Sequence, residues 1–292
     1  MKSNLNILTI EFLKLGMLTQ FQDLGRPGYQ SFGIPLGGAL DQPSAEIANK
    51  LVGNSSDQPV FEITLLGPKI KFSASAQIAI TGGDLSPKID DQSIPMYETV
   101  DVQEGNVLSF GRIKSGCRAY LAIRGEWILN KWLNSASPIE LGDSNLTPNL
   151  KISKNDKIEI GIDKNKATRK WEFDSVQIES SIRVIKGPEF KQFPEEFIDR
   201  FLQTEFTISP NSNRMGYRLD PPIAGDLDGG SLISSGIVPG TIQITPSGQP
   251  IILLNDAQTI GGYARIANVI SDDLPKLAQA KPGDFIKFTI EH

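Results

Sequence analysis

Several residues in this sequence have side chains suited to holding an oxyanion or an amide group. Arginine forms paired hydrogen bonds with carboxylate and phosphate oxygens, and side-chain amides present a donor beside an acceptor. The candidate binding residues are Arg26, Asn213, Arg214, Gln249, Gln258, Thr259 and Arg265. Gly261 and Gly262 follow closely after Thr259, and a glycine pair lets backbone amides approach an anion closely. We therefore expect these residues to contact a substrate.

Acid–base chemistry in this chain depends on carboxylates and tyrosine. The candidate bases are Asp23, Asp41 and Asp256, and the candidate proton donor is Tyr263. The only histidine is His292, the last residue, so a Ser-His-Asp or Cys-His mechanism has no other base. One histidine and one cysteine are too few for a zinc site, and we expect no metal. The sequence has no P-loop motif for a nucleotide.

Several of these residues could have either a functional or a structural role, and the sequence leaves the choice open. Asp41 is either a catalytic group or the cap of a helix. Asp23 and Arg26 either serve the chemistry or form a salt bridge that orders a loop. Glu62 is either a buried ion-pair partner or a site carboxylate. Cys117, inside an apolar run, is interpreted as a core thiol.

Composition excludes some classes of protein. The 292 residues carry a net charge of −5, which gives no basic surface for nucleic acid or an anionic membrane. No apolar run approaches the roughly 20 residues that span a bilayer. The first ten residues do not resemble a signal peptide, and one cysteine excludes an internal disulfide. We expect a cytoplasmic protein.

The elements that must position these residues are mostly strands. The 27 glycines and 19 prolines recur between short apolar runs, which favours many turns and strands. We expect strands within 70–80, 107–110, 120–123, 158–162, 182–185, 251–254 and 285–290, where apolar residues alternate or cluster. Helices are expected near 41–53, 194–203 and 271–279. The fold class is therefore mainly β with a few helices.

The length suggests two domains. Short strings recur at similar offsets: Arg26–Tyr29 is echoed by Arg214–Tyr217, which hints at two related halves. A charged stretch at 163–174 is typical of a surface linker. We expect a β-rich domain over 1–165 and a β-barrel domain over 175–292. If the two halves are related, each is a barrel-like unit, and the cleft between them is the expected site.

Two dense blocks carry a family resemblance. The first runs from Gln22 to Asp41 and contains QDLGRPGYQ and GIPLGGALD. The second comprises SNRMGYRL at 212–219, GTIQ at 240–243 and QPIILLNDAQTIGGY at 249–263. These strings are similar to the signatures of the carboxyltransferase subdomain A and B family, which includes KipA-type proteins, the C subunit of bacterial 5-oxoprolinase, allophanate hydrolase subunit 2-like proteins and part of urea carboxylase. The resemblance covers Gly16 to Phe288 and implies two cyclophilin-like β-barrel halves.

The resemblance also implies function and partners. Its 5-oxoprolinase branch implies ATP-dependent opening of 5-oxoproline to glutamate, with a partner like KipI or the B subunit of that enzyme, and with a protein like its A subunit. The urea carboxylase branch implies transfer of a carboxyl group from carboxybiotin to an amide nitrogen. Both substrates are small amides or lactams. We expect an obligate 5-oxoprolinase subunit, with ATP bound mainly by a partner. The alternatives are a carboxyltransferase component and a non-enzymatic KipA-like regulator that binds a kinase inhibitor.

The middle of the chain departs from the family pattern. Relatives have a Gly-rich, Arg-containing loop where this chain has Ser135 to Glu140, and Gly-Gly where it has Gly125-Glu126. Ala264 stands where a proline often follows Gly-Gly-Tyr. These differences, within 126–150 above all, leave open how that region contributes to substrate choice or partner contact.

Overall fold

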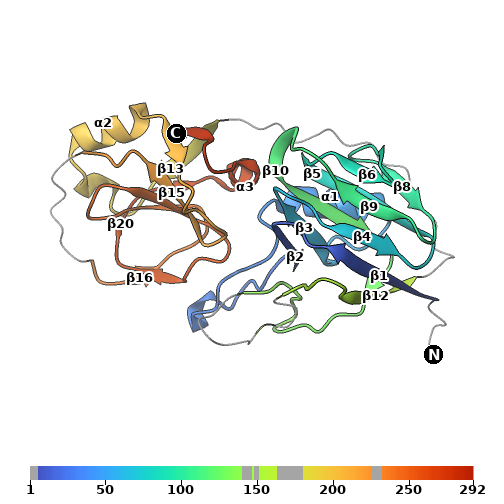
Figure 1. Cartoon of the computed structure of the whole chain (residues 1–292). Helices are drawn as coiled ribbons and strands as arrows, with labels where there is room; N and C mark the ends of the chain where they lie inside the picture. Colours follow the sequence, from blue (N-terminus) through green and yellow to red (C-terminus); the bar gives the residue numbers. More distant parts are fainter. Residues whose placement is uncertain (1–5, 140–146, 148–150, 163–179, 225–231, 292) are drawn as a thin grey trace. The chain divides into compact units, whose positions relative to one another are not determined.

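The computed structural model describes residues 6–139, 147, 151–162, 180–224 and 232–291 (Figure 1). The chain divides into two compact units. Unit 1 consists of Met1–Gly25 and Gly37–Val176, and unit 2 consists of Arg26–Leu36 and Gln177–His292. The predicted boundary at 165–175 and the predicted linker at 163–174 lie outside the described residues. The assignment of residues 26–36 to unit 2 is a feature that the sequence-based division of the chain did not include.

Unit 1 is built from two sheets. The seven-stranded sheet has the order β11 (Glu126–Trp127), β12 (Lys157–Ile162), β1 (Asn6–Lys14), β4 (Lys69–Phe72), β9 (Val107–Phe110), β6 (Pro87–Ile89) and β7 (Gln92–Ser93). The five-stranded sheet has the order β2 (Leu18–Gln22), β3 (Val60–Thr64), β10 (Ser115–Ile123), β5 (Ala76–Asp84) and β8 (Thr99–Val102). All strand pairs in both sheets for which the register is known are antiparallel.

One hydrophobic core joins the strands of unit 1. Alternate residues of β1, among them Leu8, Ile10 and Phe12, are fully buried, as the period of two in a strand requires. Phe12 meets Phe61 edge to face with ring centroids 5.4 Å apart, and Trp127 meets Phe61 at 5.0 Å. Each such buried aromatic contributes roughly 1.5–3 kcal/mol through burial. This core packs the strands of the two sheets of unit 1 together.

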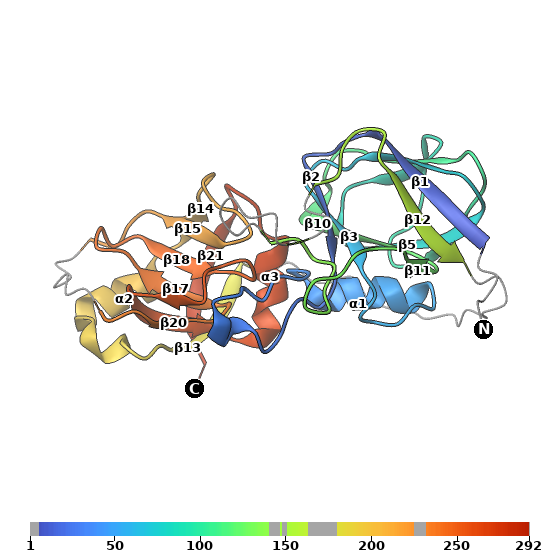
Figure 2. The same cartoon turned by 90° about the horizontal axis from the view of Figure 1, so that it is seen from below.

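Helix α1 (Gln42–Leu51) covers the five-stranded sheet of unit 1 (Figure 2). Ala45 and Ala48 face the sheet, and their small side chains let the helix approach closely. The side chain of Asp41 accepts a hydrogen bond from the Ser44 amide and caps the first turn. Pro43 at the start of the helix has no amide hydrogen that would need a partner there.

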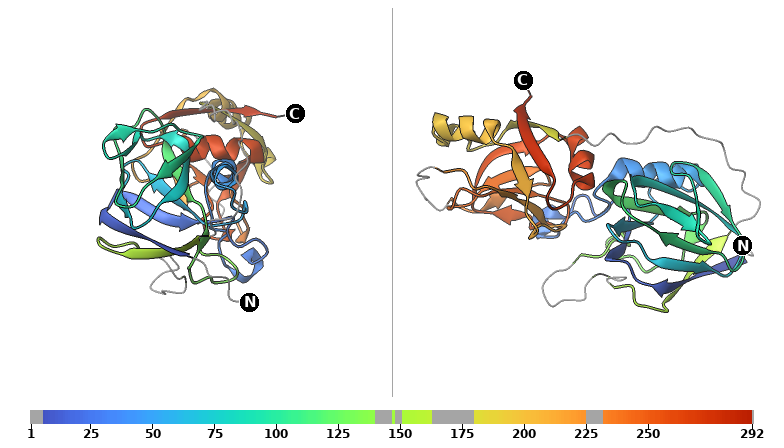
Figure 3. Two further views of the ribbon diagram at one scale, coloured as in Figure 1. Left: turned by 90° about the vertical axis from the view of Figure 1, so that its right-hand side faces the viewer. Right: turned by 45° about the horizontal axis from the view of Figure 1, so that its top comes forward.

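Unit 2 contains a closed barrel (Figure 3). Its strands follow the order β13 (Ser181–Lys186), β20 (Ala264–Val269), β17 (Thr241–Ile244), β18 (Pro250–Leu253), β15 (Gly216–Asp220), β14 (Phe206–Ile208) and β21 (Phe285–Ile290). The barrel closes where β13 pairs in parallel with β21. Helix α2 (Glu195–Gln203) packs on it through Phe201, whose ring stacks on Phe288 with centroids 4.7 Å apart.

Short elements complete unit 2. Two turns of 3₁₀ helix, η2 (Phe190–Gln192) and η3 (Ser271–Asp273), and helix α3 (Leu274–Gln279) connect barrel strands. A third, η1 (Gln30–Phe32), lies in the segment contributed by the amino-terminal part of the chain. The two-residue strands β16 (Ser235–Gly236) and β19 (Ile260–Gly261) pair with each other as a ribbon outside the barrel sheet.

The predicted fold class, mainly β with few helices and barrel architecture, is confirmed. The three predicted helices coincide with α1, α2 and η3–α3 within a few residues. Each predicted strand also corresponds to an observed one, with 70–80 divided between β4 and β5. No helix among the described residues has the length and apolar character needed to cross a membrane.

Candidate functional site

A groove in unit 2 contains two of the predicted binding residues. It has a volume of about 710 Å³ and is lined by three short segments of the chain. The lining residues are Gln30, Ser31, Gly33, Gly236, Ile237, Val238, Gln258, Thr259 and Ile260. Gln258 is exposed, whereas Thr259 is buried. The groove therefore offers an amide and a hydroxyl beside an aliphatic surface, which suits the uncharged part of a small ligand.

The β16–β19 ribbon forms one wall of the groove. Gly236 pairs with Ile260 and Ser235 with Gly261, and the Ile237 amide donates to the Thr259 carbonyl at 3.0 Å. Ile237 is buried against Leu253 and Ala257, so the ribbon is attached to the barrel through an apolar contact. Residues 258–263 contain predicted binding residues, and their pairing with 235–237 was not visible in the sequence.

Gln243 of β17 belongs to the GTIQ string of the second sequence block but was not among the candidate binding residues. It is 2% exposed, and its Nε2 donates to the Tyr263 carbonyl at 3.4 Å. A Cβ atom on Gly261 would lie 2.7 Å from the same Nε2, so glycine at this position gives the glutamine its space. The sequence signal for this residue is a glutamine within an otherwise buried strand (Thr-Ile-Gln-Ile). A buried side-chain amide needs hydrogen-bond partners, so a glutamine at such a position indicates a specific polar contact.

Arg214 and Asp256, both predicted site residues, form an ion pair. Arg214 Nε lies 2.8 Å from Asp256 Oδ2, and Arg214 Nη2 lies 3.1 Å from Asp256 Oδ1. Both side chains are largely buried, at 7% and 15% exposure. Asn213 Oδ1 accepts a hydrogen bond from the Met215 amide at 2.8 Å and so stabilises the turn that carries Arg214. The predicted binding residue Arg214 and the predicted base Asp256 are thus hydrogen-bond and ion-pair partners of each other.

Arg265 also has a protein partner. Its Nε and Nη2 donate to the Glu189 carboxylate at 2.8 and 2.6 Å, and its Nη1 donates to the Gly236 carbonyl at 3.0 Å. The side-chain hydrogen bonds from Arg265 hold the pKa of Glu189 below its usual value, and the same bonds raise the pKa of Arg265. Arg265 therefore holds the backbone of β16, which belongs to the groove wall.

The remaining predicted residues of unit 2 lie in different places. Gln249 donates to Asp220 Oδ1 at 3.0 Å and precedes β18, whereas Asp256 and Gln258 follow its other end. Tyr263 is 47% exposed. Arg26 is fully buried, and its amide donates to the Leu36 carbonyl at 2.7 Å. The structure thus brings Gln258 and Thr259 together in the groove and separates Gln249 from them.

Two predicted residues belong to buried networks of unit 1. Asp41 caps α1, and its amide donates to the Tyr120 hydroxyl at 2.8 Å. That hydroxyl donates to Glu62 Oε2 at 2.9 Å, and Arg118 Nε lies 3.6 Å from Glu62 Oε1. The capping interpretation of Asp41 and the ion-pair interpretation of Glu62 are therefore the ones observed. Burial, Glu62 and Asp41 together raise the pKa of Tyr120 well above its usual value.

Asp23 accepts hydrogen bonds from a distant segment. Its carboxylate receives the Gly25 and Ala136 amides and the hydroxyls of Ser135 and Ser137, at 2.6–2.8 Å. These donors are backbone and hydroxyl groups rather than a guanidinium. Part of the 126–150 region that departs from the family pattern is therefore attached to Asp23, while Glu140 lies outside the described residues.

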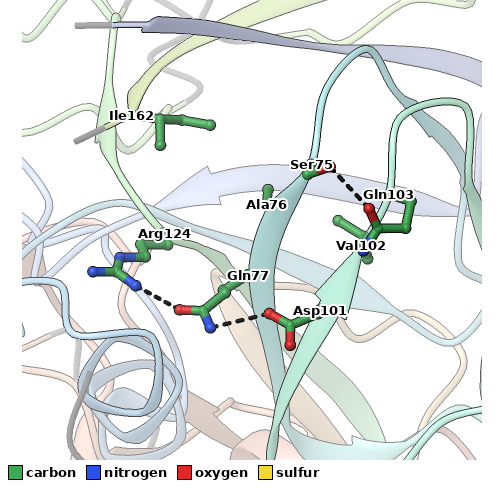
Figure 4. A pocket seen from close by; sticks show the side chains of 8 residues that line it. All are labelled: Ser75, Ala76, Gln77, Asp101, Val102, Gln103, Arg124 and Ile162. Carbon is green, nitrogen blue, oxygen red and sulfur yellow. Dashed lines mark hydrogen bonds between the residues drawn. The ribbon is translucent and has the colours of Figure 1, made fainter. Parts of the chain in front are cut away.

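A second hollow, of about 290 Å³, lies on unit 1 (Figure 4). Arg124 Nη1 donates to Gln77 Oε1 at 2.6 Å, and Gln77 Nε2 donates to Asp101 Oδ1 at 3.0 Å. Ser75 and Gln103 make a similar cross-strand bond at 3.0 Å. These are neighbouring-strand pairs of an exposed sheet surface, and none of the predicted site residues lines this hollow.

The described lining residues of the groove in unit 2 have no ionisable side chain. Three predicted ionisable residues of unit 2, Arg214, Asp256 and Arg265, are engaged in the pairs described above. No group of three His, Cys, Asp or Glu side chains within the described part of the chain is arranged to hold a metal ion. The geometry therefore supports orientation of a substrate more directly than proton transfer.

Comparisons with known proteins place these features in context. The model of the carboxyltransferase domain, subdomain A and B, matches residues 32–290. Over 280 residues the chain is 35% identical to the C subunit of 5-oxoprolinase from Escherichia coli, covering 96% of this chain and 90% of that protein. It is 34% identical to "Urea amidolyase" of Saccharomyces cerevisiae, of which it spans 16%. The solved urea amidolyase of K. lactis superposes with a TM-score of 0.86 at 32% identity, over 96% of this chain and 18% of the solved one.

Proposed function

Because the chain belongs to the family of the carboxyltransferase domain, subdomain A and B, we propose that it works as the C subunit of an ATP-dependent 5-oxoprolinase. The observation that supports this most strongly is the 35% identity to a protein of that name, with nearly the full length of both chains aligned. The proposed overall reaction converts 5-oxoproline, ATP and water into glutamate, ADP and phosphate. The urea amidolyases, by contrast, contain the matched region as a small part of a much longer chain.

The groove of unit 2 is the proposed place for the lactam. A lactam has a carbonyl acceptor beside an N–H donor, and the Gln258 amide offers the complementary donor and acceptor. The Thr259 hydroxyl adds a second polar contact, and Ile237, Val238 and Ile260 offer an aliphatic surface for the ring methylenes. In this arrangement the chain holds and orients the substrate, so that the reacting carbonyl is presented to groups from elsewhere.

A partner protein is the proposed source of the ionisable groups and of the nucleotide site. The described groove residues include no acid or base, and the sequence has no P-loop. Hydrolysis of a lactam needs proton transfer to the leaving nitrogen and activation of the carbonyl oxygen. We therefore assign ATP binding mainly to a protein like KipI or the B subunit of 5-oxoprolinase, with a protein like the A subunit of that enzyme as a further component.

A carboxyltransferase is the second candidate. It is favoured by the similarity to urea amidolyase in both sequence and structure. In that case the same groove would hold urea or a related amide, and carboxybiotin would arrive on a separate carrier protein. Urea presents the same amide edge as a lactam, so the groove alone does not separate the two substrates. The two candidate functions differ in the co-substrate that is consumed, which is ATP for the 5-oxoprolinase and carboxybiotin for the carboxyltransferase.

Reconstitution separates these functions. The chain is purified alone and in complex with co-expressed proteins of the B and A subunit types from the same organism, and glutamate release from 5-oxoproline plus ATP is measured. We expect turnover from the complete complex and none when this chain is omitted. If a well-formed complex releases no glutamate, the proposal fails. Carboxylation of urea with free carboxybiotin in a parallel assay would then establish the second candidate.

A further inference from the structure

One wall of the groove is formed by a loop whose two ends lie in unit 1. The chain leaves unit 1 after Gly25 and returns at Gly37, and the residues between them belong to unit 2. Within this loop, Gln30, Ser31 and Gly33 line the groove. The conformation of this loop therefore depends on how its two ends are held together.

The beginning and end of the loop are joined by backbone contacts. The Arg26 amide donates to the Leu36 carbonyl at 2.7 Å, and the Ala39 amide donates to the Asp23 carbonyl at 2.8 Å. Gly38 has φ of +80°, and a Cβ atom there would lie 2.6 Å from the Gly25 nitrogen. We call these paired residues, 23–26 and 36–39, the neck of the loop. Two chain segments touch there with no room for a side chain between them.

Asp23 fixes the neck to the 135–137 segment of unit 1. The residue is 6% exposed. Its Oδ1 accepts from the Gly25 amide at 2.8 Å, from Ser135 Oγ at 2.6 Å and from Ser137 Oγ at 2.8 Å. Its Oδ2 accepts from the Ala136 amide at 2.7 Å, and its own amide donates to Ser137 Oγ at 2.9 Å.

These contacts indicate whether Asp23 has a structural role or acts as a general base. An ionised carboxylate has about four lone-pair sites, and four protein donors already use them. A general base needs a free site within hydrogen-bond reach of the proton that it removes. Asp23 is buried and its lone pairs are engaged, so its chemistry is that of a rigid multiple acceptor.

We infer that Asp23 is a positioning residue for the loop: by holding the neck against residues 135–137 it keeps together the two ends of the segment that carries Gln30, Ser31 and Gly33. This rests on the proposed function only where the groove is taken as the substrate site. The effect on the loop itself is independent of any activity and can be measured without substrate.

The test is hydrogen–deuterium exchange, followed by mass spectrometry, on the full chain with Asp23→Asn. The substitution keeps size and shape but replaces one acceptor oxygen with a donor. We expect exchange of amides in residues 26–36 to rise by about tenfold or more, because charge-assisted hydrogen bonds are lost. The exchange of amides in β15 and β18 should remain unchanged. Ser137→Ala should increase the exchange of residues 26–36 by a smaller factor.

Asp273→Asn is the matched control. Asp273 is a fully buried carboxylate of unit 2 that accepts from the Arg183 amide and side chain at 2.7–3.2 Å. Its substitution should increase exchange near β13 and η3 and leave residues 26–36 as in the parent protein. Unchanged exchange of 26–36 in folded Asp23→Asn, or an equal increase in the control, overturns the inference. If Asp23→Asn does not fold, Ser135→Ala and Ser137→Ala provide the same comparison with the carboxylate intact.

Kinetics of the reconstituted complex separate positioning from catalysis. If Asp23 is a positioning residue, Asp23→Asn should raise both the KM for 5-oxoproline and the rate of amide exchange in residues 26–36. Loss of a general base would instead lower kcat by about 100-fold or more with no change in loop exchange, and that result also overturns the inference. An inactive parent complex contradicts the proposed function but leaves the exchange measurement valid.

Discussion

The guanidinium of Arg214 binds the carboxylate of Asp256 through two hydrogen bonds, 2.8 and 3.1 Å long, across 42 positions of sequence. The pair joins the loop before β15 to the loop after β18. The second of these loops continues directly into Gln258 and Thr259 of the groove. A residue pair that the sequence suggested as binder and base therefore also fixes the backbone that leads to the groove.

This pair should be strongly coupled in stability. Removing one partner leaves a buried charge without its counter-ion, so Arg214→Ala and Asp256→Ala should each lower the free energy of unfolding by about 3 kcal/mol. The double variant should lose much less than the sum, since neither charge remains. Urea denaturation of the four proteins measures the coupling. Additive losses would show that the two side chains act independently.

The neck of the loop should be intolerant of a side chain at Gly38. Gly38→Ala requires both a left-handed backbone at φ of +80° and a Cβ atom 2.6 Å from the Gly25 nitrogen. Gly28→Ala is the matched control, because Gly28 has φ of +91° and nothing within 4 Å of the added atom.

We expect Gly28→Ala to cost about 1–2 kcal/mol of unfolding free energy from backbone strain alone. Gly38→Ala should cost at least about 1–3 kcal/mol more, through overpacking. Chemical denaturation of both variants measures the difference. Equal losses would contradict a tightly closed neck.

Stability should fall in acid partly through Asp273. Burial favours the neutral form of this group, but hydrogen bonds from Arg183 and Lys276 outweigh burial and lower its pKa to about 2. Because the folded pKa lies below the unfolded value, near 3.9, the stabilisation is complete above about pH 5 and is lost progressively as the pH falls through 2. It amounts to about 2–3 kcal/mol.

Urea denaturation of the parent protein and of Asp273→Asn, at pH 6 and at pH 2.5, measures this contribution. The two proteins should differ most at pH 6 and converge at low pH. A difference that stays constant over this range would mean that ionisation of Asp273 does not stabilise the fold.

Much of the fold could be predicted because its signals are local. The cap at Asp41, followed by Pro43 and the apolar spacing of Ala45 and Ala48, determines α1 within a short stretch of chain. The alternation of Ile286 and Phe288 similarly predicts β21. These patterns depend only on neighbours within one element, which is why a single sequence reveals them.

The groove could be predicted only in part, because it depends on pairings between distant residues. Gln258 and Thr259 were identified as polar side chains in a glycine-rich block. The partner of Arg265 is Glu189, 76 positions away, and no local signal connects them. The placement of residues 26–36 in unit 2 is similarly a property of the folded chain, because it depends on contacts with residues far along the sequence.

The measurement that tests the central claim most directly is the KM of the reconstituted complex for 5-oxoproline with groove variants of this chain. Gln258→Ala removes an exposed amide and Thr259→Val removes a hydroxyl at constant shape. Gln103→Ala, an exposed glutamine of unit 1, is the control. We predict that each groove variant raises KM by about 3- to 10-fold, as loss of one hydrogen bond implies, with kcat nearly unchanged and the control equal to the parent complex. Groove variants with the parent KM, in an active complex, would contradict the assignment of the groove as the substrate site.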